Sequence, residues 1–160
     1  MSESLIGVIS DTHGLFDPKL PSLFSSVSRI LHAGDVGHLR VLEQLAKIAP
    51  VTAISGNIDE GNLPPGFATE EEICLEGIQI FMTHILGSPA RIVPAMRKRI
   101  EQAAPNVVIF GHSHKPLLET IEGILYFNPG SAGPRRFSLP RSVGLLRIRE
   151  GKCEGEIVYL

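Results

Sequence analysis

Five short apolar runs of strand length each end in a histidine, an acidic residue or an asparagine, and this recurring arrangement constrains the fold most strongly. The clearest run begins at Val107 and leads directly into Gly111, His112, Ser113 and His114. Its β-branched and aromatic residues favour a short buried strand. The glycine allows a sharp turn, after which both histidines can face one cavity. Histidine pairs are common on protein surfaces, so this segment alone does not establish a metal site.

The four earlier runs are followed by side chains of the same restricted chemistry. These runs cover residues 5–10, 29–34, 51–55 and 78–82, and the residues after them are Asp11 and His13, Asp35, Asn57, and His84, respectively. Loops after strands are polar in any protein, which is an adequate explanation for any one of these residues. It is a poor explanation for seven residues limited to imidazole, carboxylate and carboxamide groups. Together they form a set of metal ligands without thiolates.

The segments between the runs predict an α/β fold. Apolar residues recur at three- and four-residue intervals from 38 to 49, which predicts an amphipathic helix closed by Pro50. The first third therefore has the order βαβαβ, which is typical of a parallel sheet. In such sheets ligands bind outside the carboxyl ends of the strands, where the seven polar residues stand.

The second half is predicted to be largely antiparallel. A helix is expected from about Pro89 to Ala103, with Pro94 near its start. Two sheets packed face to face, with helices outside, would then form a single domain over residues 1–160. The predicted hairpins pair 72–75 with 78–82, 117–120 with 124–127, and 143–148 with 155–159.

Composition excludes several classes of protein. Apolar residues make up 43% of the 160 residues and charged residues 20%, as in a soluble globular domain. The net charge of −2 provides no basic surface of the kind that nucleic-acid binders carry, so nucleic acid is not expected as a partner. Cys74 and Cys153 lack metal-binding spacing and are predicted to be buried free thiols. The first residues predict neither a signal peptide nor a spanning helix, hence no membrane association and a cytoplasmic location.

The motifs together resemble the calcineurin-like metallophosphoesterase superfamily, in which DxH, GD, GN, an isolated histidine and GHxH occur in this order. The compact length and the segments 56–59 and 127–131 are similar to the small prokaryotic YfcE-type branch, which is related to a retromer scaffold subunit. The resemblance implies a four-layer α/β/β/α sandwich and two divalent ions bridged by Asp35. The implied ligands are Asp11, His13, Asp35 and His114 for one ion, and Asp35, Asn57, His84 and His112 for the other.

Such a site has a definite chemistry. Two ions about 3.5–4 Å apart lower the pKa of a shared water and clamp the oxygens of a phosphoryl group. The predicted function is a dinuclear metal-dependent phosphoesterase, and more specifically a phosphodiesterase, acting on a small-molecule phosphoester. A metal-bridging hydroxide, held with the help of Asp35, Asn57 and His84, would attack phosphorus in line. Mixed nitrogen and oxygen ligands suit Mn²⁺, Fe, Zn²⁺, Ni²⁺ or Co²⁺, and the resemblance favours manganese.

Two departures from the family pattern bear on the reaction. Ile58 stands where much of the superfamily has a histidine that is thought to assist the leaving group. Without an imidazole acid, esters whose leaving group departs easily should be favoured. Asp59 could reach the site as a catalytic residue, or it could form an Asx-type turn or a helix cap. Ile85 follows His84 where the family often has glycine, which leaves the shape of the pocket open.

Several further residues have two interpretations each. His32 could orient a ligand from behind or simply be a hydrogen-bonded histidine at a strand end, whereas His38 should face solvent. Residues 128–131 form a turn by composition, and its amides or Asn128 could also support the site. Arg135 and Arg136 could grip a phosphate or remain a solvated basic pair.

Other functions also remain open. A non-catalytic or weakly catalytic protein-binding scaffold on the same fold is the main alternative, although such a scaffold has no physical need for the complete ligand set. A nuclease acting on short nucleic acids is more remote because of the acidic pI of about 6.3. The C-terminal strands could pair between subunits, which would give a homo-oligomer.

Overall fold

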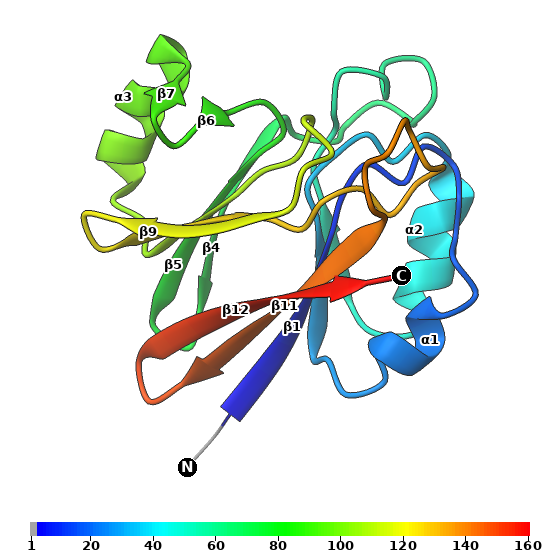
Figure 1. Cartoon of the computed structure of the whole chain (residues 1–160), viewed down its shortest axis with the longest axis horizontal. Helices are drawn as coiled ribbons and strands as arrows, with labels where there is room; N and C mark the ends of the chain where they lie inside the picture. The colour runs from blue at the N-terminus through cyan, green and yellow to red at the C-terminus, as the bar shows by residue number, and fades with distance from the viewer. Residues whose placement is uncertain (1–2) are drawn as a thin grey trace.

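Two five-stranded sheets form the centre of the fold in a computed structural model that describes residues 3–160 (Figure 1). The first sheet has the order β12-β11-β1-β2-β3, and the second has the order β4-β5-β8-β10-β9. The strands of the first are β1 (Glu3–Ile9), β2 (Arg29–His32), β3 (Val51–Ala53), β11 (Ser142–Arg149) and β12 (Lys152–Tyr159). Those of the second are β4 (Glu70–Leu75), β5 (Ile78–Thr83), β8 (Val107–Ile109), β9 (Leu117–Ile121) and β10 (Ile124–Asn128).

The helices cover the outer faces of the two sheets. Helices α1 (Leu20–Leu23) and α2 (Leu39–Ala46) lie on one side of the molecule, and α3 (Pro94–Ala103) lies on the other (Figure 1). Three buried clusters correspond to this layering, because one lies between the sheets and one lies under the helices on each side. The predicted four-layer α/β/β/α sandwich is therefore confirmed.

The parallel part of the first sheet arises from the predicted βαβαβ segment. Strands β1, β2 and β3 are parallel neighbours, whereas β11 joins β1 antiparallel and makes the sheet mixed. Both faces of β1 are covered, so its apolar residues from Ile6 to Ile9 are buried without alternation. Helix α2 begins after His38, whose exposed side chain accepts a hydrogen bond from the Arg40 N–H as an N-cap.

The three predicted hairpins are all present. They are β4–β5, β9–β10 and β11–β12, each antiparallel. Strand β8 differs from its surroundings because it runs parallel to both β5 and β10. It is fully buried from Val107 to Ile109, which explains its continuous apolar run. This direction brings the end of β8 to the same edge as the end of β5.

The predicted helix from about Pro89 to Ala103 is wrong at its start. Residues 87–92 form a small ribbon of β6 (Gly87–Ser88) and β7 (Arg91–Ile92), and α3 begins only at Pro94. Proline lacks an N–H and has a fixed φ, so it suits the first turn of a helix and disfavours helical backbone at the residue before it. Pro94 therefore sets the start of α3.

The prediction of buried cysteines is wrong in part. Both thiols are free, but Cys74 is exposed on the edge strand β4 and Cys153 is half-buried on the edge strand β12. An edge strand has fewer neighbours to cover its side chains, which explains the difference. Among residues 3–160, no helix is long and apolar enough to cross a membrane.

Candidate metal centre

The loops that follow β1, β2, β5 and β8 meet at one edge of the sandwich, at the upper edge in Figure 1. Backbone hydrogen bonds fasten these loops to one another in pairs. The Asp11 N–H donates to the Gly34 carbonyl at 3.0 Å, and the Gly111 N–H donates to the His84 carbonyl at 3.1 Å. Both sheets therefore contribute side chains to one small volume.

Left-handed backbone is concentrated in these loops. Five of the seven candidate ligands have a φ between 46° and 71°, although none of them is glycine. This conformation costs roughly 1–2 kcal/mol per residue and persists only where the surrounding structure imposes it. Strain of this kind clusters at functional sites. The five residues are Asp11, His13, Asp35, His112 and His114.

Asp11 is completely buried, and its two carboxylate oxygens have different surroundings. Its Oδ2 atom accepts hydrogen bonds from the Ser10 hydroxyl at 2.7 Å and from the His112 N–H at 3.1 Å. Its Oδ1 atom faces imidazoles instead. The distances from Oδ1 to the Nε2 atoms are 3.4 Å for His114, 3.8 Å for His84 and 3.9 Å for His13.

Asp35 is oriented in the same manner. Its Oδ1 atom accepts the Ile58 N–H at 3.0 Å, and its Oδ2 atom lies 3.2 Å from His84 Nε2 and 3.7 Å from His13 Nε2. This position between two imidazoles suits a ligand shared by two ions. Gly56 permits the arrangement, because a Cβ atom there would lie 2.1 Å from Asp35 Oδ1. The close approach of Asp35 thus explains why the GN pair has a glycine at this position.

The tautomer of His84 is determined by its neighbour. Its Nδ1 atom lies 2.8 Å from the Ala33 carbonyl oxygen, which can only accept, so Nδ1 carries the proton. In the neutral ring Nε2 then has a free lone pair directed at the carboxylates. A backbone carbonyl behind the ring is the usual support of a metal-binding histidine.

Asn57 and His112 lie at the outer side of this group, and both are exposed. The Asn57 Oδ1 atom and the His112 Nδ1 atom are 3.1 Å apart. The His112 ring stands edge-on to the His84 ring, with centroids 5.3 Å apart. These donor atoms are therefore close enough to serve one ion.

The ligand atoms separate into two groups, each with donor atoms within 4.8 Å of one another. One group is Asp11, His13 and His114, and the other is Asp35, His84 and His112. Each group is part of one of the two ligand sets that the family resemblance implies, and the assignment of these residues and of Asn57 as ligands stays a prediction.

Unpaired polar atoms indicate that cations fit these groups. Within residues 3–160, three buried side-chain atoms have no hydrogen-bond partner, namely Asp11 Oδ1, His13 Nε2 and His84 Nε2. A buried polar group without a partner costs about 1–3 kcal/mol, and all three atoms belong to the candidate ligands. A divalent ion in each group would satisfy them.

The pKa values follow from burial and mutual contact. Burial favours a higher pKa for Asp35, but its contacts with His84 and the Ile58 N–H outweigh burial and lower the pKa. Burial alone would lower the pKa of His84, whereas Asp35 and Asp11 raise it. The pKa of His13 is lowered, chiefly by burial. The net pKa of His84 is raised and that of His13 is lowered, so a metal ion would compete with a proton more strongly at His84 than at His13.

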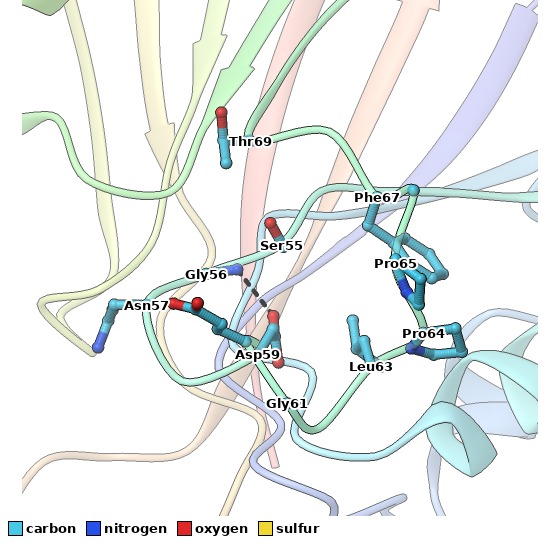
Figure 2. Close-up of a pocket in the computed structure, with 12 residues that line it drawn as sticks. Ser55, Gly56, Asn57, Asp59, Gly61, Leu63, Pro64, Pro65, Phe67 and Thr69 are labelled. Carbon is cyan, nitrogen blue, oxygen red and sulfur yellow. Dashed lines mark hydrogen bonds between the residues drawn. The ribbon is translucent and has the colours of Figure 1, made fainter.

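Asp59 lies next to the site, but its carboxylate is occupied by backbone groups. It is 2% exposed and accepts the N–H groups of Gly56 at 2.7 Å, Gly37 at 2.9 Å and Val36 at 3.2 Å. Figure 2 shows the bond to Gly56. This geometry favours the turn-bracing interpretation, because the carboxylate joins the loop after Asp35 to the loop that carries Asn57. A catalytic role for Asp59 stays a prediction.

Three residues behind the ligands also brace the site. His32 is fully buried, accepts the Gly34 N–H at Nδ1 and contacts the Thr12 hydroxyl through Nε2 at 3.0 Å. Asn128 donates to the Gly111 carbonyl and to Ser113 Oγ, so it supports the loop of His112 and His114. The third residue is Ser10, whose hydroxyl donates to Asp11 Oδ2. Sequence reasoning missed it, because a serine before a strand-end aspartate carries no distinguishing signal.

The Arg135 and Arg136 side chains are exposed in the segment that follows Gly133. Gly133 packs so tightly that a Cβ atom there would lie 2.4 Å from the Asp11 carbonyl oxygen. Arg136 is near enough for its charge to contribute to the lowered pKa of His13. Neither arginine belongs to the ligand cluster.

The sandwich and the convergent carboxylates and imidazoles define a metallophosphoesterase-type protein, a class that uses divalent metals. Residues 5–151 match the calcineurin-like phosphoesterase superfamily domain, and the chain belongs to this family. A probable metallophosphoesterase of Methanocaldococcus jannaschii is 35% identical over 96% of this chain and 80% of its own. Phosphodiesterase YfcE of Escherichia coli is 32% identical over 67% of this chain and 58% of its own.

The fold also extends to the retromer subunit Vps29, as the motifs predicted. The structure of Vps29 from Entamoeba histolytica, solved as a zinc complex, superposes with a TM-score of 0.75 at 22% identity, covering 97% of this chain and 98% of that one. At this level of identity the similarity shows the fold alone. The predicted membership of a YfcE-like family with a Vps29 relative is confirmed.

Proposed function

We propose that the protein is a dinuclear metal-dependent phosphodiesterase. One observation carries this proposal: three buried polar atoms converge, namely Asp11 Oδ1, His13 Nε2 and His84 Nε2. Within the described residues none of the three has a hydrogen-bond partner. Two divalent ions held there would supply Lewis acidity, lower the pKa of a coordinated water and stabilise charge on the phosphoryl oxygens. Mn²⁺ is the proposed ion on the family resemblance alone, since nitrogen and oxygen ligands without thiolate suit Fe, Zn²⁺, Ni²⁺ and Co²⁺ as well.

The chain's own groups prepare the site for the reaction. Asp35 would hold both ions because its Oδ2 atom lies between the two groups of imidazoles. Asn57 and His84 would fix the second ion beside the phosphoester. The candidate ligands include only two carboxylates, so the loaded pocket would remain positive and attract an anionic ester.

Ile58 is the reason for proposing diesters with good leaving groups. Its backbone N–H is directed at Asp35 Oδ1, and its side chain provides no proton donor at the place of the superfamily histidine. A leaving group that departs without protonation avoids the need for such an acid. We include a cytoplasmic location and a small-molecule phosphoester substrate in this proposal.

Hydrolysis of bis(p-nitrophenyl) phosphate with added Mn²⁺ tests the proposal. Wild type should hydrolyse the ester, whereas Asp35→Ala and His114→Ala should reduce kcat by at least about 100-fold, as when a group acting in the transition state is removed. His38→Ala is the matched control, because His38 is an exposed histidine that caps α2 and belongs to neither ligand group. Equal rates in all four proteins would refute the proposal.

The second candidate is the protein-binding scaffold considered above. The observation that favours it is the sandwich fold shared with Vps29. Metal binding alone does not separate the two functions, because that Vps29 was solved as a zinc complex. Turnover does separate them. A metal-loaded protein that is inactive on diesters, monoesters and anhydrides, and that retains a stable protein partner, would favour the scaffold.

A further inference from the structure

A cavity of about 510 Å³ opens between the segment Ser55–Asp59 and the following loop to Thr69 (Figure 2). Its volume lies within the range of roughly 300–1,000 Å³ that is usual for small-molecule sites. Figure 2 shows Leu63, Pro64, Pro65 and Phe67 together on one side of this space, opposite Ser55 and Gly56. One wall is therefore apolar, and the other is backbone of the GN segment.

This cavity adjoins the candidate metal centre. A second cavity, of about 300 Å³, is lined by His84 and by Ile85 and Met96. The two cavities share four lining residues and therefore meet at the GN segment. A phosphoester held at His84 and Asn57 could thus extend one of its substituents toward the apolar wall. The shared residues are Ser55, Gly56, Asn57 and Thr69.

The loop that encloses the larger cavity is fastened at both ends. The Asn62 and Leu63 N–H groups donate to the Asp59 carbonyl, each at 2.9 Å, and the Ser55 N–H donates to the Ala68 carbonyl at 2.8 Å. Leu63 and Phe67 also pack against the core beneath α1 and α2. The cavity is therefore preformed, which reduces the entropy lost when a ligand binds.

Charge limits what the cavity can hold. Asp59 and Glu60 are its only charged lining residues, and its described lining contains no lysine or arginine. The Asp59 carboxylate already accepts three backbone N–H groups, whereas Glu60 is exposed. A substituent with a further phosphate would be repelled by Glu60, but an uncharged ring would pack on Phe67 and the two prolines.

We propose that this cavity binds an uncharged, ring-containing ester substituent of the substrate. It would select diesters with such a group over small alkyl diesters and over diesters that carry an additional phosphate. The inference rests on the proposed phosphodiesterase function, because it assumes that phosphorus is held at the metal centre. Phe67 supplies ring contact, and Glu60 supplies discrimination by charge.

Two esters with the same leaving group test the ring contact. The Mn²⁺-loaded protein should hydrolyse phenyl p-nitrophenyl phosphate with a kcat/KM at least about 10-fold above that of methyl p-nitrophenyl phosphate, as expected for filling an apolar pocket. Phe67→Ala should remove most of this preference, measured as the ratio of the two kcat/KM values, which a uniform loss of activity would not change. Leu118→Ala, a large apolar residue exposed on β9, is the matched control and should retain the preference.

Glu60→Lys tests the discrimination by charge. Glu60 is exposed, so the substitution should leave the fold intact. It should raise kcat/KM at least about 10-fold for a p-nitrophenyl diester whose other substituent carries a phosphate, with little effect on the phenyl ester. Binding gives a readout independent of turnover. Saturation-transfer NMR should show the ring protons of diphenyl phosphate in contact with wild type and with Leu118→Ala, but much less with Phe67→Ala.

The outcomes separate the two proposals. If wild type hydrolyses neither ester, the phosphodiesterase proposal fails. If it hydrolyses both, but Phe67→Ala and Glu60→Lys leave the ratios of kcat/KM and the NMR contacts unchanged, the cavity does not receive the substituent, and the phosphodiesterase proposal stands alone.

Discussion

The His112 backbone N–H donates to the Oδ2 atom of Asp11 at 3.1 Å, although the two residues are 101 positions apart in the chain. The Ser10 hydroxyl donates to the same oxygen at 2.7 Å. Together these bonds direct Asp11 Oδ1 toward the imidazoles. The DxH and GHxH loops thus position each other, and the carboxylate is the link between them.

Ser10→Ala should weaken metal binding without removing a ligand. Loss of a hydrogen-bonding partner behind a metal ligand typically lowers affinity by about 10–100-fold, and Asp11→Asn should lower it further. Isothermal titration of the metal-free protein with Mn²⁺ measures the effect. Ser28→Ala is the matched control, since its exposed hydroxyl contacts only the Leu5 carbonyl. Unchanged affinity in Ser10→Ala would contradict the support of Asp11 by Ser10, and unchanged affinity in Asp11→Asn would show that Asp11 is not a ligand.

Metal addition should stabilise the fold strongly. The unpaired atoms of Asp11, His13 and His84 would gain partners only when ions bind. At a free Mn²⁺ concentration of 100 times Kd, each site should add about 2.7 kcal/mol to the free energy of unfolding. Chemical denaturation with Mn²⁺ and with a chelator measures this difference. His114→Ala should lose much of it, and an equal gain in His114→Ala and wild type would contradict the assignment.

The strand ends could be predicted from the sequence because apolar runs and polar stops are local patterns. The hairpin turns are local too, since Glu76 and Gly77 both adopt the positive φ that a tight turn requires. The start of α3 was missed because the five residues before Pro94, from Pro89 onward, were read as helix. Only the structure shows the ribbon of β6 and β7 there.

The site was predicted as a set of residues but not as a geometry. The left-handed backbone at Asp35 and His114 is imposed by loops from other strands, and no local pattern encodes it. The same holds for Asp59, whose partners lie in two loops. Sequence periodicity reports which face of an element is apolar, whereas these features depend on contacts between distant segments.

Asp59→Asn separates the two interpretations of Asp59. An amide retains one acceptor oxygen but places an NH₂ group against backbone donors, so the free energy of unfolding should fall by roughly 1.5–3 kcal/mol. Metal affinity should fall with it, because the loops of Asp35 and Asn57 lose their link. Denaturation and calorimetry measure both, with Glu60→Gln as the exposed neighbouring control. Unchanged stability with an altered pH–rate profile would instead indicate proton transfer by Asp59.

His32 should make the metal-free protein sensitive to mild acid. Burial lowers its pKa from 6.5 to about 4, although Asp11 and Asp59 oppose the shift. The neutral ring accepts the Gly34 N–H at Nδ1, so Nε2 carries the proton toward the Thr12 hydroxyl, which in turn donates to the Val36 carbonyl. Protonation of Nδ1 would break this chain of hydrogen bonds.

The direction in which stability changes with pH follows from the protonation of His32 in the folded and unfolded states. Below pH 6.5 the His32 side chain binds a proton in the unfolded chain, whereas in the folded protein it does so only below about pH 4. The stabilisation by neutral His32 is therefore complete above pH 6.5 and is lost as the pH falls from 6.5 to about 4. The loss should be on the order of 3 kcal/mol. The measurement compares wild type with His32→Gln in chelator at pH 7 and pH 4.5. The stability advantage of wild type should shrink at the lower pH, and a constant difference would show that His32 titrates normally in the fold.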